Sequence, residues 1–214
     1  MLASTSEKNR GILRQQKILE VAEHLFLTKG YAGTSVNEVV KLSGGSLNTL
    51  YRYFGNKLGL FEAVFTAKTA DLFAPFQTTD FWQADMRSNL LAFGGALQEV
   101  ALSPEGIAIY RLVITENNQE QEKIQKIFYS KGPQTAFKIL ADYLILQRTQ
   151  GHIHVEHPEM AANQFIEMVK GPFLYPALFG QPLEQAKIQL ALEQAVELFL
   201  EGCLQTQLPT DTQP

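Results

Sequence analysis

The sequence is short of the residues that disulfides, membrane spans and secretion signals require. Its one cysteine, Cys203, excludes an intramolecular disulfide and fits a reducing cytoplasm. It has no apolar run of about 18 residues, so we expect no membrane-spanning helix. The first ten residues also lack the apolar segment of a secretory signal peptide. Together these absences predict a cytoplasmic protein.

Residue patterns with metal-binding or catalytic chemistry are equally sparse. His152, His154 and His157 lie close together, but their spacing matches no common zinc site and is typical of a solvated loop. Cys203 falls on an apolar helical stripe, where thiols are usually inert. The two Gly-Gly pairs lack the lysine that a phosphate-binding loop needs. We therefore expect no metal, no cofactor and no enzymatic activity.

Charge is distributed unevenly along a chain whose net charge is −4. Residues 1–60 hold eight Lys/Arg and four Asp/Glu, which leaves ten Lys/Arg and eighteen Asp/Glu for residues 61–214. A basic N-terminal part attracts DNA phosphates, and an acidic remainder is repelled by them. The distribution favours a DNA-binding head on an acidic body. Lys8, Arg10 and Arg14 either extend this head as a basic arm or belong to a solvated tail.

Residues 34–57, TSVNEVVKLSGGSLNTLYRYFGNK, have the pattern of two short helices around a tight turn. Ser35 and Glu38 form a capping box, which predicts a helix start near residue 35. Gly44-Gly45 ends this helix, because glycine reaches the left-handed conformation of a tight helix exit. Ser46 is expected to cap the second helix, and Gly55 to end it.

The second of these helices has two different faces. Leu50, Tyr53 and Phe54 follow the i, i+3, i+4 spacing of a buried face. The opposite face carries small or polar side chains, including Asn48 and Arg52. Such a pair of helices is typical of a helix-turn-helix, whose second helix enters the DNA major groove. The spacing alone is also compatible with a plain helical hairpin.

The residues around this segment carry a family resemblance. Gly30-Tyr31, Thr34-Ser35-Val36, the run from Thr49 to Phe54, and Asn56-Lys57 stand in a fixed order and spacing. Together they resemble the N-terminal domain of the TetR family of transcriptional repressors, over about residues 14–65. One position departs from the family pattern: Gly45 stands where the family usually has an apolar residue. This departure leaves the angle of the recognition helix open.

The resemblance implies DNA contacts at the matching positions. Asn48 and Arg52, one helical turn apart, are expected to face bases, because Arg suits guanine and Asn suits adenine. Phosphate contacts are expected from Tyr51, Lys57 and the helix N-terminus at residues 34–35. The full predicted DNA-binding set is Thr34, Ser35, Ser46, Leu47, Asn48, Thr49, Tyr51, Arg52, Tyr53 and Lys57.

The remaining residues predict helices throughout, with no strand and no internal repeat. We therefore expect an all-α protein: a disordered basic arm at 1–10, a three-helix helix-turn-helix domain at 11–57, a larger helical effector-binding and dimerisation domain at 58–205, and a disordered tail at 206–214. Within the body, helices are expected at 80–102, from Ser103-Pro104-Glu105 onward, and over 119–149 with a break at Gly132-Pro133.

A second, C-terminal resemblance bears on the body. The run SPEGIAIYRLVI, followed by F-Y-x-x-G-P, is similar to the ligand-binding domain of a TetR branch that includes AefR-like repressors. This resemblance implies a helical domain that binds an effector and forms homodimers. We expect a two-fold dimer through helices at about 159–179 and 183–204. The last helix has more apolar residues than one inward face requires, and the additional ones are Leu192, Leu200 and Leu204.

An effector cavity is expected beside Arg111, the single charge within an otherwise apolar helix. Arg111 either pairs with an acid such as Glu116 or Glu167, or anchors a polar or anionic effector. The predicted pocket residues are mostly aromatic or apolar, as in many ligand sites. They are Trp82, Phe93, Tyr110, Arg111, Phe165 and Met168.

These expectations combine into one functional hypothesis. The chain is predicted to be a homodimeric transcriptional repressor that binds a palindromic operator in double-stranded DNA. It is expected to release the operator when a small apolar or amphipathic effector fills the body. One alternative is a ligand-independent or activating regulator of the same fold. A second alternative is a helical enzyme or carrier whose head docks another protein.

Overall fold

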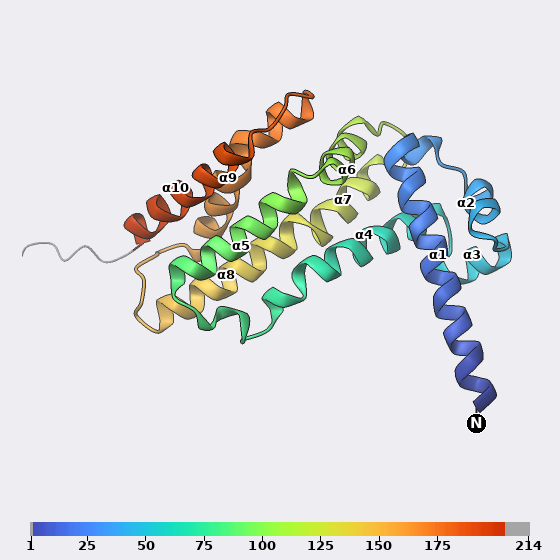
Figure 1. The fold of residues 1–214 in the computed structure, drawn as a ribbon, viewed down its shortest axis with the longest axis horizontal. Coiled ribbons are helices and arrows are strands. Elements are labelled where there is room, and N and C mark those ends of the chain that lie inside the picture. The colour runs from blue at the N-terminus through green and yellow to red at the C-terminus, as the bar shows by residue number, and fades with distance from the viewer. Residues whose placement is uncertain (1, 204–214) are drawn as a thin grey trace, which may run out of the picture. The chain divides into compact units, whose positions relative to one another are not determined.

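The computed structural model describes residues 2–203, with side chains from residue 9 onward. Within this range the chain consists of helices and short 3-10 turns and has no strand (Figure 1), which confirms the predicted all-α class. None of the helices in residues 2–203 is long and apolar enough to cross a membrane. The predicted tail at 206–214 lies outside the described residues.

Contacts divide the chain into two compact units. The first unit comprises residues up to Leu72 together with Pro104–Pro133, and the second comprises Phe73–Ser103 together with residues from Gln134 on. The sequence placed a single boundary between residues 57 and 58. Contacts instead group a later segment of the chain with the N-terminal helices, because its apolar side chains complete the core of the first unit.

The first unit contains α1 (Leu2–Gly33), α2 (Val36–Ser43), α3 (Leu47–Phe54), α4 (Lys57–Phe73), α6 (Pro104–Thr115) and α7 (Gln121–Lys131). Its core joins Ile18, Phe26 and Leu50 of the N-terminal helices to Leu112 of α6 and Ile124 of α7. Burying these side chains together is the main favourable contribution to folding. Helices α6 and α7 are therefore part of the unit that carries the helix-turn-helix.

Helix α1 starts earlier than the sequence predicted and is interrupted near its end by a glycine. The sequence predicted a disordered arm at 1–10, whereas in the structure α1 begins at Leu2. Residues 2–10 contain no proline or glycine to interrupt a helix. Near the other end, Gly30 has φ 74° and ψ 173°, which only glycine adopts readily. The regular helix therefore breaks at Gly30.

The turn between α2 and α3 follows the sequence closely. Gly44 ends α2 in the left-handed conformation with φ 72°. The Ser46 hydroxyl accepts a hydrogen bond from the Thr49 backbone N–H at 3.2 Å and caps α3. The predicted capping box is wrong, because Ser35 makes no side-chain cap. Glu38 instead binds Lys29 of α1 at 2.6 Å, a partner supplied by tertiary structure.

The second unit contains η1 (Pro75–Gln77), η2 (Phe81–Gln83), α5 (Met86–Ala101), α8 (Pro133–Thr149), α9 (Pro158–Leu178) and α10 (Gln185–Cys203). Helices α5, α9 and α10 pack against one another. The expected helix at 80–102 is shorter than predicted, because Asp85 caps α5 through the Ser88 backbone N–H. The break at Gly132-Pro133 is confirmed as the end of α7 and the start of α8.

Candidate DNA-binding surface and effector pocket

Helix α3 has one buried and one exposed face. Leu50 and Phe54 are buried in the core of the first unit. Asn48, Tyr51 and Arg52 are exposed. The buried pair fixes the rotation of the helix, and this rotation directs the polar side chains outward. The exposed face therefore offers the donors and acceptors that base edges can recognise.

Tyr53 lies between this exposed face and α1. The Arg52 guanidinium stands 5.2 Å from the centroid of the Tyr53 ring, within the range of a cation–π contact. A Cβ placed on Gly11 of α1 would lie 3.4 Å from the Tyr53 hydroxyl, so α3 approaches α1 closely at this point. Tyr53 therefore supports Arg52 and also packs α3 against α1.

Two neighbouring residues predicted to bind phosphate have different surroundings. Thr34 is 2% exposed, and its hydroxyl donates to the Gly30 carbonyl at 2.8 Å. The Thr34 hydroxyl is therefore already used inside the turn, and a phosphate contact from Thr34 stays a prediction. Ser35 is exposed at the N-terminus of α2, with its hydroxyl making no cap. Of these two residues, Ser35 is the one whose side chain is open to a ligand at this helix end.

Lys57 lies at the start of α4 and is only partly exposed. Its Nζ donates to the Ala32 carbonyl at 3.3 Å and lies 4.4 Å from the centroid of the Tyr31 ring. Burial lowers the pKa of Lys57, whereas the charges of Glu116 and Glu120 act in the opposite direction. Lys57 is thus engaged inside the first unit, and a phosphate contact from it stays a prediction.

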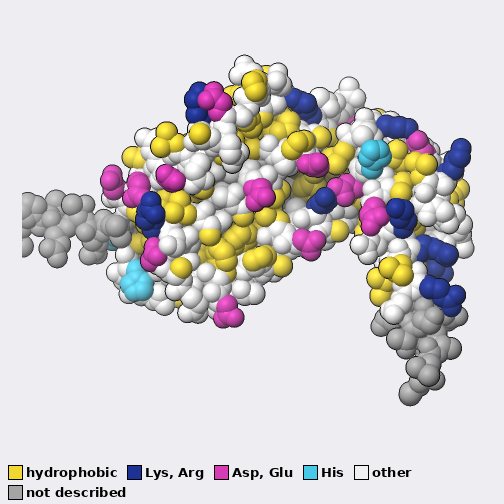
Figure 2. Space-filling model, viewed as in Figure 1, with side chains coloured by type: hydrophobic (Ala, Val, Ile, Leu, Met, Phe, Trp, Pro, Cys, Tyr) yellow, Lys and Arg dark blue, Asp and Glu magenta, His cyan; other side chains and the backbone are white. Residues whose placement is uncertain are grey.

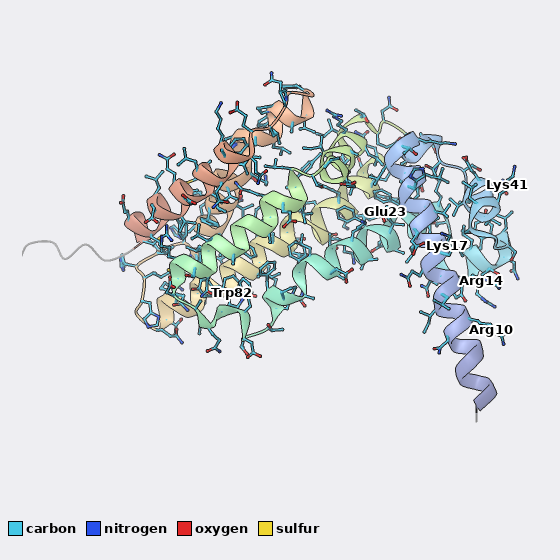
Figure 3. The ribbon with its side chains drawn as sticks, in the orientation of Figure 1. Arg10, Arg14, Lys17, Glu23, Lys41 and Trp82 are labelled. Carbon is cyan, nitrogen blue, oxygen red and sulfur yellow. The ribbon has the colours of Figure 1, made fainter. Side chains whose placement is uncertain are left out.

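Basic side chains follow α1 and reach α2. Arg10, Arg14 and Lys17 recur at intervals of four and three residues, which places them along one side of α1 (Figure 3). Lys41 is exposed on α2, and dark-blue side chains gather over these helices in Figure 2. The spacing of these residues is visible in the sequence. Because residues 1–10 were expected to be disordered, we did not expect these basic residues to share one face of a helix.

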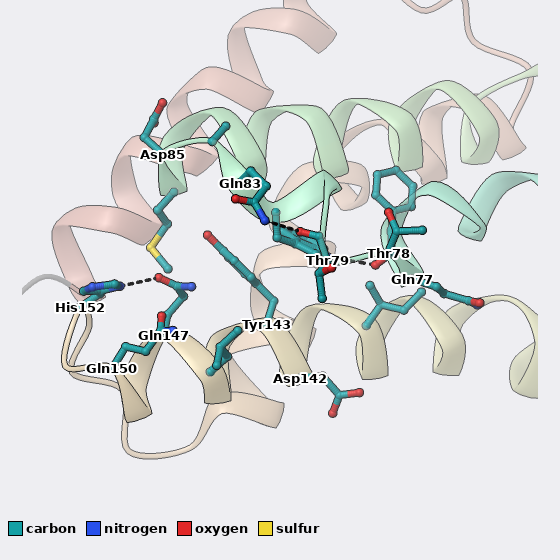
Figure 4. A pocket seen from close by; sticks show the side chains of 16 residues that line it. Gln77, Thr78, Thr79, Gln83, Asp85, Asp142, Tyr143, Gln147, Gln150 and His152 are labelled. Atoms are coloured by element: carbon teal, nitrogen blue, oxygen red, sulfur yellow. Dashed lines mark hydrogen bonds between the residues drawn. The ribbon is translucent and has the colours of Figure 1, made fainter.

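A cavity of about 890 Å³ opens in the second unit (Figure 4). It lies between the segment of η1 and η2 and helix α8, and its aromatic wall includes Phe76, Trp82 and Tyr143. The rings of Trp82 and Tyr143 stack with centroids 4.1 Å apart. The Trp82 Nε1–H donates to the Phe76 carbonyl at 2.9 Å, which fixes the indole in the wall.

The charged groups of the cavity, which include the carboxylates of Asp85 and Asp142, disfavour an anionic ligand. Its lining contains no lysine or arginine, and Gln83 and Gln147 supply amide groups. The Tyr143 hydroxyl accepts a hydrogen bond from buried Asn89 at 3.1 Å, which leaves its own proton available to donate. Burial raises the pKa of the Tyr143 hydroxyl, and the bond from Asn89 lowers it. Asp142 also lines the cavity, but its carboxylate points away from Tyr143 (Figure 4).

The predicted pocket residues are dispersed in the structure. Trp82 lines the cavity, whereas Phe93 and Phe165 are fully buried in the core. Tyr110 and Arg111 belong to the first unit and do not line it. Met168 lies in a different groove, between α9 and α10. The sequence did not single out Tyr143, because only the fold brings α8 beside Trp82.

An exposed, polar second helix on a compact helix-turn-helix, in an all-α chain, defines a DNA-binding regulator. Sequence comparison gives the same class: residues 18–64 match the bacterial regulatory proteins of the tetR family, and residues 88–202 match the AefR-like transcriptional repressor, C-terminal domain. The chain therefore belongs to the TetR family of DNA-binding transcriptional regulators. This assignment confirms both predicted resemblances, and the family consists of regulators rather than enzymes.

Individual relatives extend over nearly the whole chain. YvkB of Bacillus subtilis (strain 168), an uncharacterised HTH-type transcriptional regulator, is 26% identical over 187 residues, which cover 87% of this chain and 95% of YvkB. The structure of a TetR-family regulator from Mesorhizobium loti MAFF303099 aligns with a TM-score of 0.80 at 24% identity, covering 92% and 99% of the two chains. The flavonoid-responsive regulator FrrA aligns with a TM-score of 0.75 at 26% identity, covering 89% and 97%.

Proposed function

We propose that this regulator is a repressor that binds a palindromic operator as a homodimer and leaves it when an effector occupies the second unit. The observation that carries operator binding is the exposed face of α3, held outward by buried Leu50 and Phe54. The alternative of an activating regulator shares this surface and differs in where the operator lies relative to the promoter.

Base recognition is assigned to Asn48 and Arg52, and Leu47 and Thr49 complete the face that meets the groove. Arg52 offers the bidentate donor pair that suits guanine, and Asn48 offers the donor and acceptor that suit adenine. Phosphate contacts are assigned to Ser35, Tyr51 and the basic side of α1. These contacts set the register of α3 in the groove without reading sequence.

Dimerisation is assigned to the outer face of α9 and α10. Tyr175 and Phe179 are 66% and 77% exposed, and Leu190 and Leu198 are 65% and 56% exposed. Such a concentration of exposed apolar side chains on two adjacent helices favours a four-helix seam between two copies. Leu192 and Leu200, which the sequence assigned to this seam, are buried within the protomer instead. Leu204 lies outside the described residues.

A groove between α9 and α10 supports the same assignment. It has a volume of about 850 Å³ and is lined in part by Met168, Pro172 and Leu198. A Cβ on Gly202, which also borders the groove, would meet no atom within 4 Å, so a partner helix has room to approach. A two-fold dimer would place two recognition helices on successive major grooves, about 34–36 Å apart or a multiple of that distance.

The effector is assigned to the cavity beside Trp82 and Tyr143. A flat aromatic molecule would gain ring contacts from these two side chains, and its hydroxyl or carbonyl groups would meet Tyr143 and the glutamine amides. FrrA, to which this chain is similar, is flavonoid-responsive. Flavonoids carry aromatic rings and hydroxyl groups but no carboxylate or phosphate, which suits a lining without lysine or arginine. This ligand class falls on the amphipathic side of the apolar or amphipathic effector expected from the sequence.

A mobility-shift assay with the DNA upstream of the protein's own gene tests the proposal. We expect a discrete complex that competitor DNA of random sequence does not remove, and reporter expression that rises when the gene is deleted. A fall in expression on deletion would indicate an activator. A protein that binds all DNA equally would contradict operator recognition.

A further inference from the structure

Two acidic side chains reach the N-terminal helices from the turn between α6 and α7. The Tyr31 hydroxyl donates to Glu120 Oε2 at 2.5 Å, and the Ala32 backbone N–H donates to Glu116 Oε2 at 3.2 Å. Tyr31 and Ala32 lie between the break at Gly30 and the start of α2. The two carboxylates therefore hold the junction through which α1 leads into the helix-turn-helix.

The turn itself is fixed by a third polar side chain. The Asn118 amide donates to Glu116 Oε1 at 2.7 Å, and the Asn118 side-chain oxygen accepts from the Glu120 backbone N–H at 2.7 Å. Asn118 thus connects the Glu116 carboxylate to the backbone of Glu120. These two hydrogen bonds fix the turn from which both acids reach Tyr31 and Ala32.

Burial and charge make these contacts strong. Tyr31 is 1% exposed and Glu116 is 7% exposed. Burial, followed by the hydrogen bond to Glu120, raises the pKa of the Tyr31 hydroxyl, so it stays a donor. Lys57 lies over the Tyr31 ring and balances the negative charge of the two acids. Hydrogen bonds to ionised groups in such surroundings are stronger than neutral ones.

We propose that Glu116 and Glu120 are positioning residues for operator binding, although they lie outside the helix-turn-helix sequence. By binding Tyr31 and Ala32, they fix the backbone that leads from α1 into α2. The position of α2 in turn fixes the orientation in which α3 meets DNA. When only a fraction of the molecules presents α3 correctly, the apparent operator affinity falls in proportion to that fraction. This inference rests on the proposed operator binding, and its structural part can be measured without DNA.

Three single variants test the proposal with little change in shape. Tyr31→Phe keeps the ring that packs against Phe26 and Phe61 but removes the hydroxyl. Glu120→Gln keeps the size of the side chain but removes the charge. Glu122→Gln, an exposed neighbour in the first turn of α7, is the matched control for loss of one negative charge. The double variant Tyr31→Phe/Glu120→Gln measures the coupling between the two partners.

Two readouts separate positioning from general stability. Amide hydrogen exchange without DNA is expected to accelerate in α2 and α3 in Tyr31→Phe and Glu120→Gln, and to stay at the wild-type rate in Glu122→Gln. Operator affinity is expected to fall about tenfold in the first two variants, which is the effect of one charge-assisted hydrogen bond. The double variant is expected to lose little more than either single variant.

The outcomes distinguish this inference from the proposed function. Unchanged exchange in α2 and α3 of Tyr31→Phe and Glu120→Gln would overturn the positioning role, whatever the protein binds. Equal acceleration across all helices of the first unit would also overturn it, because this would indicate general destabilisation. If exchange accelerates locally but the wild type binds no specific DNA, the positioning role stands and operator recognition fails.

Discussion

The ring of Trp82 stacks on the ring of Tyr143 with an interplanar angle of 21° and centroids 4.1 Å apart. Trp82 is the single tryptophan of the sequence, so its fluorescence reports on one wall of the cavity. Asn89 holds the Tyr143 hydroxyl at 3.1 Å and the Ala84 carbonyl at 2.9 Å, which ties the aromatic wall to the start of α5. A ligand that enters the cavity therefore changes the surroundings of the fluorophore directly.

Ligand binding at this wall is the first prediction. We expect the flat flavone apigenin to quench Trp82 fluorescence, and Tyr143→Phe to weaken its binding up to about tenfold by removing one hydrogen-bond donor. Titration calorimetry measures the affinity independently of fluorescence. Tyr129→Phe, at an exposed position of α7, is the matched control. Palmitate is expected to bind poorly, because no lysine or arginine lines the cavity. Tighter binding of palmitate than of apigenin would contradict the assigned ligand class.

The second prediction concerns the dimer. Leu190→Glu together with Leu198→Glu is expected to yield monomers at micromolar concentration, since two charges would be buried in an apolar seam. Sedimentation velocity measures the change in mass. Ile114→Glu, at a residue 62% exposed on α6, controls for the effect of adding a charge to an exposed apolar site. A double variant that sediments like the wild-type dimer would place the seam elsewhere.

The helix-turn-helix was predictable because its signals are local. Gly44, Ser46 and Gly55 each act on residues within one helical turn, and all three stand where the sequence predicted. The role of Glu38 was not predictable in the same way. Glu38 was expected to form a capping box with Ser35. It pairs instead with Lys29, which belongs to another helix and could not be identified as a partner from local sequence.

The proposed dimer face and the cavity could be recognised only from the fold. Helix α10 is apolar on more than one side, and its periodicity alone did not show that Leu192 faces inward while Leu190 faces outward. The cavity joins Trp82 to Tyr143, which are far apart in the sequence. The same limit applies to the hydrogen bond between Tyr31 and Glu120, whose partners are 89 positions apart.

Two adjacent glycines of α5 give the third prediction, which concerns stability. A Cβ on Gly94 would lie 2.7 Å from Leu192 Cδ1, with Val169 and Phe165 close behind, so Gly94→Ala is expected to lower the free energy of unfolding by about 1–3 kcal/mol. A Cβ on Gly95 would lie 3.5 Å from Leu192 Cδ2, an ordinary contact. Gly95→Ala is therefore expected to be neutral or to stabilise by up to about 1 kcal/mol through helix propensity. Urea unfolding measures both, and equal effects would refute the close packing of α5 on α10.

The last prediction separates base recognition from charge at Arg52. Arg52→Ala is expected to cost about 1–3 kcal/mol of operator binding and to relax the preference at one base position. Arg52→Lys keeps the positive charge but loses the planar donor pair, so it is expected to lose nearly as much specificity while keeping the wild-type salt dependence.

Lys126→Ala, at an exposed position of α7, controls for loss of charge in the same unit. The measurement is a mobility shift against operators varied one base pair at a time, at several salt concentrations. If Arg52→Lys retains full discrimination among these operators, Arg52 contributes charge alone, and base reading at this side of α3 must come from Asn48.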